Sequence, residues 1–352
     1  MKRQNSNTAA PHHSHTSPYE VWLLLDSRDF GGIESHVLQL AQGLATVNCV
    51  VTVVFLSRYK TEHPLLTALT NANISYHFLD GKFMSLLHYT QQHPPTVIHS
   101  HGYKAAIYSR LLRLSLLLSS HNVRFINTFH AGEIGSGKLR WYDRIDRWSA
   151  ALSHHNFAVS KQIKQRVHTP ITVLNNFIST DQLSLSNGKE IAFVGRLSHE
   201  KAPDRFLQLA QQHPKHDFHI YGSGPMENGI AQQAPINLIL HGHQSTMEPI
   251  WKEIGLLVIC SRYEGLPMAA LEAMGRGIPI ISTPVGNMSK LITQDNNGWI
   301  VEPDDLSAQL QYWFDLDDSN KATIQASAQQ TIQTDFSTQA IIPQVFAIYA
   351  HT

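Results

Sequence analysis

The 352-residue sequence is poor in cysteine, in net charge and in long apolar runs, and each shortage excludes a class of protein. Its two cysteines, Cys49 and Cys260, lie far apart in apolar surroundings. We therefore expect two buried thiols in a reducing compartment rather than a disulfide framework. Acidic and basic residues number 27 each, which gives no electrostatic argument for a nucleic-acid partner. No stretch reaches the roughly 18 apolar residues that a membrane span requires.

The amino-terminal segment also lacks a targeting signal. Residues 1–18 are polar and rich in Ser, His and Pro, without the apolar core of a signal peptide. This composition predicts a disordered tail on a cytoplasmic protein.

Apolar strand-like runs alternate with segments of helical period, which is typical of βαβ units with a buried parallel sheet. The first series of expected strands comprises Val21–Leu25, Val50–Leu56, Ile74–Leu79, Val97–His99, Phe125–Thr128 and Asn156–Val159. After a polar stretch the second comprises Ile191–Val194, Asp217–Tyr221, Ile236–Leu240, Leu256–Cys260 and Pro279–Ser282. Two helical segments are expected after Asp304.

The sequence therefore predicts an α/β protein with two Rossmann-like, doubly wound parallel-sheet domains that face a cleft. We expect the first domain at 19–178, a linker at 179–189 and the second domain at 190–335. Residues 336–352 are expected to form a carboxy-terminal helix that returns to the first domain. Ligands of such folds bind at the carboxyl ends of the strands, so the loops there are the places to search for chemistry.

Two of these loops have features that suit a diphosphate. Gly31 and Gly32 precede an expected helix, and a backbone without side chains can approach a phosphate at a helix amino terminus. Gly195 opens the segment GRLSHEK directly after a buried strand, and this segment contributes Arg196 and Lys201. A guanidinium fork and an ammonium group are both suitable partners for a diphosphate.

The segment from Glu264 to Glu272 is the most informative. A strand ends near Cys260, and Pro267 suits the first position of the following helix. The free amides near Gly265, Leu266, Pro267 and Met268 could then bind an anion. Glu272 lies just over one turn into a helix with apolar neighbours, and a carboxylate can hold two adjacent sugar hydroxyls.

Histidine is abundant, with 22 residues, so position must decide which of them matters. His130 follows the strand Phe125–Thr128 at the end that faces the cleft. His99 and His101 also end a strand, and we assign them to the pocket wall at most. Gly222–Gly229 (GSGPMENG) partly mimics a dinucleotide fingerprint, but Glu227 occupies the third glycine position, so we interpret the segment as a tight turn.

Together these segments resemble the group 1, or family 4, glycosyltransferases. The resemblance rests on GGIESH, NTFHAGE, HNFAVS, GRLSHEK, YGSGP and EGLPMAALEAMGRGIPIISTPVG in that order. It covers roughly residues 19–350 and implies the GT-B fold and a retaining enzyme that uses a nucleotide-diphosphate sugar. A UDP-sugar is the first expectation, with a glycan or lipid-linked acceptor of polysaccharide or lipopolysaccharide biosynthesis.

The resemblance also implies roles for single residues. Gly31 and Gly32 would line the donor phosphates, and His130 would reach the transferred sugar. Arg196 and Lys201 would bind the diphosphate. Glu264 would hold hydroxyls of the donor sugar and Glu272 those of the ribose, while the amides of Gly265 to Met268 would contact sugar and phosphate. Two positions depart from the family pattern, since Ala131 and Ala202 stand where glycine often follows the histidine and the lysine.

Two other functions remain open. A nucleotide-sugar epimerase of the same fold would want further acids in the cleft, and a non-catalytic binding protein would not need all four of Arg196, Lys201, Glu264 and Glu272. The sequence has no Asp-x-Asp metal motif, and we expect neither a metal nor a cofactor.

A peripheral membrane contact is a further prediction. Tyr103–Arg113 and Lys138–Arg147 combine aromatic residues and leucine with a set of cations: Lys104, Arg110, Arg113, Lys138, Arg140, Arg144 and Arg147. Such a face could rest on anionic lipid. The alternative is that these segments are ordinary sheet-covering helices with solvated cations.

Overall fold

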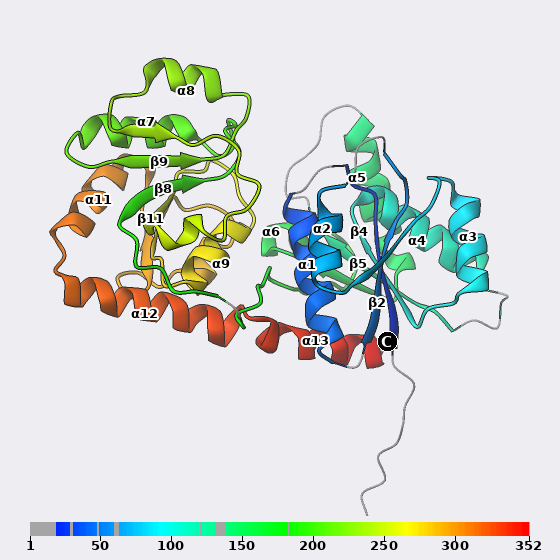
Figure 1. Ribbon diagram of the computed structural model, residues 1–352. Coiled ribbons are helices and arrows are strands. Elements are labelled where there is room, and N and C mark those ends of the chain that lie inside the picture. The colour runs from blue at the N-terminus through cyan, green and yellow to red at the C-terminus, as the bar shows by residue number, and fades with distance from the viewer. Residues whose placement is uncertain are drawn as a thin grey trace, which may run out of the picture.

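The computed structural model describes residues 19–28, 31–47, 49–59, 63–117, 119, 122–130, 138–181 and 183–351. The predicted tail at residues 1–18 lies outside these ranges. Within them the chain forms two lobes side by side, each with its own sheet (Figure 1). Cys49 and Cys260 are free, buried thiols, as predicted.

The first lobe contains a seven-stranded sheet in the order β3-β2-β1-β4-β5-β6-β7, and all its strand pairs are parallel. Its central strands β1, β4 and β5 are buried on both faces because helices cover both sides. They are β1 (Tyr19–Leu25), β2 (Cys49–Phe55), β3 (Ser75–Phe78), β4 (Val97–His101), β5 (Arg124–Phe129), β6 (His155–Ala158) and β7 (Thr172–Val173). The helices between them are α1 (Gly32–Ala45), α2 (Leu65–Asn71), α3 (Phe83–Gln92), α4 (Tyr103–Ser115), α5 (Lys138–Trp148) and α6 (Lys161–Gln165).

The second lobe contains a six-stranded parallel sheet in the order β10-β9-β8-β11-β12-β13. Its strands are β8 (Glu190–Val194), β9 (Phe218–Tyr221), β10 (Leu238–Leu240), β11 (Ile254–Ile259), β12 (Ile280–Ser282) and β13 (Gly298–Ile300). Its helices are α7 (Pro203–Gln212), α8 (Glu227–Gln233), α9 (Met268–Gly275), α10 (Met288–Leu291), α11 (Leu306–Asp315) and α12 (Asp318–Asp335).

Both strand orders are those of a Rossmann-like sheet, so the predicted fold class is confirmed. The pattern missed β7 and β13, because two and three residues are too short to show a period. It also expected two helices after Asp304 where the structure has three. The additional break falls at Asp317, whose carboxylate accepts a hydrogen bond from the Asn320 amide and starts α12 afresh.

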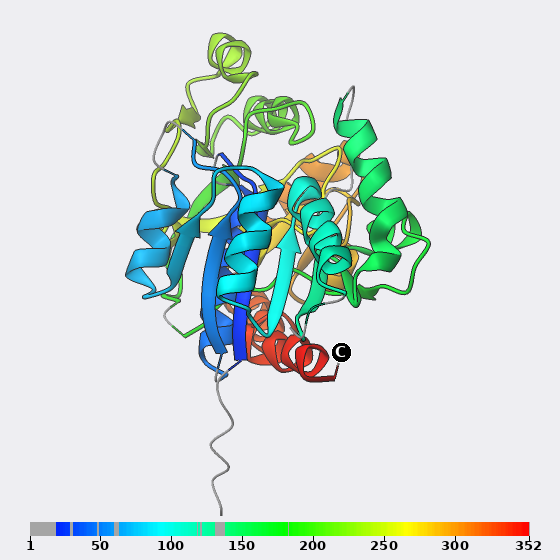
Figure 2. The same ribbon diagram turned by 90° about the vertical axis from the view of Figure 1, so that its right-hand side faces the viewer.

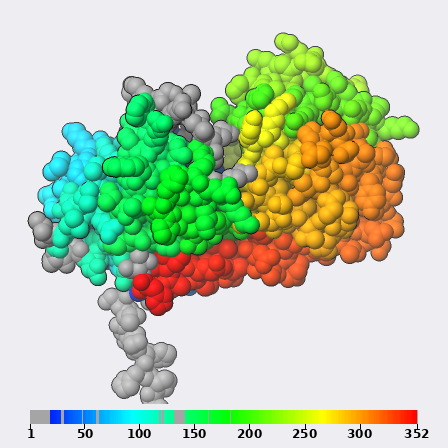
Figure 3. All heavy atoms as spheres, turned by 180° about the vertical axis from the view of Figure 1, so that it is seen from behind, coloured from blue at the N-terminus to red at the C-terminus, as the bar shows by residue number. Residues whose placement is uncertain are grey.

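The chain returns to the first lobe at its end. The last helix, α13 (Thr338–His351), packs beside α1, and its Ile341, Ile342, Val345 and Tyr349 belong to the hydrophobic core of the first lobe. Figure 2 shows this helix passing beneath the first sheet. In Figure 3 the red and orange helices α12 and α13 join the two lobes below the hollow between them.

The two sheets reverse their strand order between β1 and β4 and between β8 and β11. A ligand site is expected at the carboxyl ends of these strands. The loops that leave β1, β5, β8 and β11 therefore define where the site lies.

Candidate active site

A cleft of about 840 Å³ lies between the lobes, and both of them line it. From the first lobe come Asp26, Ser27, Gly31, Gly32, Ile33, Glu34, His130, Val159 and Asn176. From the second come Phe193, Val194, Gly195, Arg196, Lys201, Val258, Ile259, Ser261, Glu264, Gly265, Leu266, Pro267, Met268 and Ala269. Every predicted site residue except Glu272 is in this set.

The first wall is the amino terminus of α1. Gly31 is its N-cap, and its amide donates to Glu34 Oε2 at 2.8 Å. This capping contact satisfies one backbone donor, and the amides that follow remain available at the positive end of the helix dipole. The paired glycines therefore place backbone donors, without intervening side chains, on the cleft.

The second wall contains the two predicted cations. Arg196 follows β8 and is exposed, whereas Lys201 forms an ion pair with Glu264 Oε1 across the loop. Ala202, which stands where the family often has glycine, adopts a left-handed backbone with φ of 54°. That conformation explains the family's glycine, because a Cβ atom makes it costly.

The glycine-rich segment after β9 supports this loop from behind. The amides of Gly195 and Leu197 donate to the carbonyls of Tyr221 and Ser223, each at 3.0 Å. A Cβ on Gly222 would lie 1.9 Å from the Gly195 carbonyl oxygen, so only glycine fits this close approach. The interpretation of Gly222–Gly229 as a turn was wrong in its last three residues, because α8 begins at Glu227.

The third wall is the loop between β11 and α9. Glu264 Oε1 accepts hydrogen bonds from Lys201 Nζ and, at 3.0 Å, from Ser261 Oγ. α9 begins at Met268, with Pro267 as its N-cap rather than its first helical residue. The first amides of α9 therefore face the cleft without intrahelical partners.

Glu272 is outside this wall. It lies one turn further along α9, and its carboxylate accepts a hydrogen bond from Trp251 Nε1 at 3.1 Å. Burial raises its pKa, against the opposing effects of the Arg276 charge and the Trp251 hydrogen bond. The ribose role of Glu272 therefore stays a prediction, and in this structure its carboxylate is already engaged beside the cleft.

His130 lies on the cleft directly after β5, and its Nε2 shares a hydrogen bond of 3.0 Å with His101 Nδ1. Burial, together with the neighbouring His36 and His101, holds the pKa of His130 well below its usual value. The imidazole is therefore neutral at physiological pH. His101, which we assigned to the pocket wall, is its hydrogen-bonding partner.

Sequence reasoning did not single out His36, Asn176 or Ser261. Asn176 Nδ2 donates to the Leu266 carbonyl at 2.8 Å, while its Oδ1 contacts His36 Nδ1 at 3.1 Å. It thereby connects the two lobes at the floor of the cleft. Asn176 lies in a polar stretch without period, so only its place beside the expected linker could have drawn attention to it.

The cleft thus combines an arginine, a lysine and two helix amino termini with a carboxylate and a neutral imidazole. Two family profiles match the chain with little overlap. The profile described as Glycosyltransferase Family 4 matches residues 30–182, and that of Glycosyl transferases group 1 matches residues 176–330. The chain belongs to the group 1 glycosyltransferases.

Curated relatives of this transferase act in glycan synthesis. The O-antigen biosynthesis glycosyltransferase WbnH of Escherichia coli is 28% identical over 247 residues, which cover 65% of this chain and 70% of the relative. The glycogen synthase of Mycobacterium tuberculosis is 24% identical over 290 residues, covering 72% and 68%.

Solved structures share the fold across nearly the whole transferase. The Anabaena protein Alr3699/HepE in complex with UDP has a TM-score of 0.79 at 15% identity, covering 95% of this chain and 100% of that one. TarM has a TM-score of 0.77 at 12% identity, covering 94% and 98%. At such identities the likeness establishes the GT-B fold alone. Within the described residues, no helix has both the length and the apolarity to cross a bilayer.

Proposed function

We propose that this glycosyltransferase moves a sugar from a nucleotide-diphosphate donor to a surface-glycan intermediate, with retention of anomeric configuration. The donor that we propose first is a UDP-sugar. The observation that carries this proposal is the cleft, which brings cations, helix amino termini and a neutral histidine together from both lobes. The names of the relatives, among them the O-antigen enzyme, support a glycan acceptor.

The departing nucleotide gains negative charge on its terminal phosphate as the glycosidic bond breaks. Arg196, Lys201 and the amides at the start of α9 are fixed positive groups on the wall where that phosphate would lie. Groups already oriented toward developing charge lower the transition state more than the ground state. This arrangement favours transfer without a metal ion, because the cations supply the charge that a divalent ion would otherwise provide.

The state of the cleft carboxylates bears on the route by which retention would be achieved. Asp26 pairs with Lys104 at 3.1 Å, Glu34 caps α1, and Glu264 is held by Lys201 and Ser261. A carboxylate that is already hydrogen-bonded is a poor nucleophile. We therefore infer attack on the leaving-group face, with His130 beside the transferred sugar.

The same observation counts against the epimerase. An epimerase needs acids that are free to move protons or activate water. The three described carboxylates lining the cleft are all partnered. A non-catalytic binding protein is the remaining alternative.

One experiment separates the three functions. The chain is incubated with UDP-sugars, with and without candidate acceptor glycans, and the products are analysed by mass spectrometry and by the anomeric proton couplings in NMR spectra. Acceptor-dependent release of UDP with a retained anomer supports the proposal. Interconversion of UDP-sugars without an acceptor indicates the epimerase, and binding without any product indicates the binding protein.

Metal independence has its own expected outcome. Transfer should continue at an unchanged rate in EDTA, because Arg196 and Lys201 neutralise the leaving group. The rate is measured before and after dialysis against the chelator. Complete loss of transfer, restored by Mg²⁺, would contradict this scheme.

A contact with the inner face of a membrane is the second part of the proposal, and the structure changes its basis. Of the predicted cations, Arg110 is buried against Asp146, Arg147 pairs with Asp143 and Lys104 pairs with Asp26, so these three do not supply a basic surface. Arg144 is exposed and lies over the Trp141 ring. The side chains of Lys138 and Arg140 lie outside the described residues.

The apolar part of that face is exposed. Trp141 and Trp148 are 66% and 87% exposed, and Tyr142 and Ile145 lie on the same helix α5. The aspartates of α5, Asp143 and Asp146, are turned inward and buried. Tryptophan and tyrosine favour the interface between headgroups and acyl chains, so α5 is suited to rest on lipid by apolar contact.

Vesicle flotation tests this contact. The double variant Trp141→Ser and Trp148→Ser should lose flotation with both neutral and anionic vesicles, whereas Tyr312→Ser, an exposed aromatic of α11, should not. No flotation of the parent protein with either vesicle would leave a water-soluble acceptor as the better proposal.

A further inference from the structure

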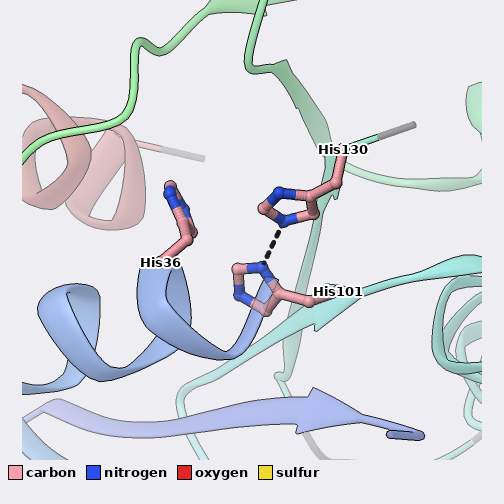
Figure 4. A group of neighbouring side chains, drawn as sticks. All are labelled: His36, His101 and His130. Carbon is pink, nitrogen blue, oxygen red and sulfur yellow. Dashed lines mark hydrogen bonds between the residues drawn. The ribbon is translucent and has the colours of Figure 1, made fainter. Parts of the chain in front are cut away.

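Three histidines from separate elements meet beside the cleft. His36 belongs to α1, His101 ends β4, and His130 follows β5 (Figure 4). One ring nitrogen from each of them lies within 4.8 Å of the others. We call these residues the histidine trio.

Two ring nitrogens of the trio have no hydrogen-bond partner in the part of the chain that the structure describes. The Asn176 amide group donates to Leu266, which fixes its oxygen toward His36, so His36 Nδ1 must carry the proton. His36 Nε2 then has a free lone pair. Both His36 Nε2 and His101 Nε2 are buried and have no hydrogen-bond partner among the described residues. A buried polar atom without a partner is costly, so a water molecule or another ligand is expected to reach it.

The remaining features are those of a metal ligand set. Neutral imidazole is the ligating form of histidine. A hydrogen bond from the second ring nitrogen to an amide oxygen, such as His36 makes with Asn176, is the usual way in which a ligating imidazole is oriented.

We propose that the histidine trio binds one divalent transition-metal ion, with Zn²⁺ the best match. Three imidazoles suit Zn²⁺, Co²⁺, Ni²⁺ or Cu²⁺ and do not suit Mg²⁺ or Ca²⁺, which prefer oxygen ligands. His130 lines the cleft, so the ion can enter there. A fourth ligand, water or a phosphate oxygen, would come from the cleft that His130 lines.

Binding requires a small rearrangement. Nitrogens on one tetrahedral zinc ion, each about 2.1 Å from the metal, lie roughly 3.4 Å apart. His101 Nδ1 and His130 Nε2, 3.0 Å apart, are already near this spacing, whereas the widest separation in the trio, within 4.8 Å, has to shrink by about an ångström. His101 and His130 now share one hydrogen, and a metal bound at either of those two nitrogens displaces it.

The consequence for activity rests on the proposed function. His130 on a metal ion is no longer free to meet the transferred sugar. Zinc in the trio should therefore inhibit transfer, and a chelator should relieve the inhibition. This is a site at which metal stops the reaction, and transfer itself needs no metal.

The test measures binding directly. Residues 1–18 contain His12, His13 and His15, which could hold zinc themselves, so all variants carry these three as glutamine. Zn²⁺ affinity is measured by competition with a chromogenic chelator, and coordination by the visible absorption of Co²⁺. The tail variant should bind one equivalent with a tetrahedral Co²⁺ spectrum, and Mg²⁺ should not compete.

Two further substitutions locate the ion. His130→Gln, at a half-buried position, and His36→Gln should each weaken zinc binding at least about tenfold, whereas His88→Gln, on the exposed face of α3, should not. Circular dichroism confirms that each variant is folded. Equal zinc affinity in His130→Gln and His88→Gln would overturn the site, as would no binding by the tail variant.

The inhibition is tested separately. Zinc should slow acceptor-dependent transfer by the tail variant, with recovery in EDTA. Zinc bound at one equivalent with an unchanged transfer rate would overturn the inhibitory role alone. If no donor and acceptor give transfer, the proposed function fails, and the affinity measurements still decide the metal site.

Discussion

Lys201 and Glu264 form an ion pair on the second-lobe side of the cleft. Each has been assigned a different partner on the donor, phosphate for the lysine and sugar hydroxyls for the glutamate. When the donor binds, the contact between Lys201 and Glu264 is therefore replaced by two others, from the lysine to phosphate and from the glutamate to sugar hydroxyls. The ion pair holds both side chains in place, which lowers the conformational entropy that donor binding would otherwise cost.

Replacement of the cations should act on the chemical step. Lys201→Ala and Arg196→Ala should each lower kcat about 10²- to 10³-fold, with smaller changes in the donor Michaelis constant, because their contacts strengthen as charge develops on the phosphate. Steady-state kinetics measure this, with Lys215→Ala, an exposed lysine away from the cleft, as the control. Unchanged turnover in both variants would remove the diphosphate assignment.

Glu272 gives a sharper test of the ribose assignment, because it has a partner already. Glu272→Ala should weaken binding of free UDP if the carboxylate turns from Trp251 to the ribose hydroxyls. Trp251→Phe, which removes only the indole N–H, should leave or improve UDP affinity, since it releases the carboxylate. Calorimetry measures both. Equal UDP affinity in Glu272→Ala and parent protein would restrict the residue to a structural role.

Within the second lobe, glycines let one loop support another. Gly286 has a φ of 53°, and a Cβ there would lie 2.0 Å from the Gly265 carbonyl oxygen and 2.4 Å from that of Glu264. The amide of Asn287 also donates to the Gly265 carbonyl at 2.7 Å. The loop that carries Glu264 is therefore positioned by the segment after β12.

Gly286→Ala should consequently damage both stability and donor binding. The left-handed conformation alone costs an alanine about 1–2 kcal/mol, and the collision displaces the Glu264 loop. Gly229→Ala is the matched control, because it lies in α8 with open space around the new methyl group and should stabilise by about 0.5–1 kcal/mol. Urea denaturation and UDP-sugar titration measure the pair. Equal behaviour of the two variants would show that the loops are not coupled.

The sequence predicted the strands and most of the cleft for a common physical reason. Buried parallel strands are continuous apolar runs, and their carboxyl ends share one edge, so Arg196 and Glu264 could be assigned to one site from position alone. The histidine trio could not be predicted from sequence position in this way. His36 lies on a helix, and only packing shows that it faces His101 and His130. Likewise, the sequence cannot show that Arg110 folds inward to Asp146 rather than outward to solvent.

The last helix, α13, completes the core of the first lobe although it follows the second lobe in sequence. Tyr349 hydrogen-bonds His99 Nδ1 at 2.6 Å inside the core, and Ile341, Ile342 and Val345 are buried with it. Burial of each such aliphatic side chain contributes about 1.5–3 kcal/mol, and a whole domain is stable by only about 5–15 kcal/mol.

A chain ending at Ser337 should therefore lose the first lobe while retaining the second. Limited proteolysis followed by mass spectrometry should show rapid cleavage within residues 19–178 and protection of residues 190–335. The full chain under the same conditions is the control. Equal protection of both lobes in the truncated chain would contradict a structural role for α13.

The position of α13 in the chain also affects the order in which the two lobes fold during synthesis. A ribosome releases the first lobe's strands early, and domains generally fold in the order in which they are made. Here the residues of α13 that complete the first core are made after the whole second lobe. The earlier lobe must wait, with the apolar surface beside α1 uncovered, until the later lobe has been synthesised. The second lobe can therefore complete its hydrophobic core before the first lobe does.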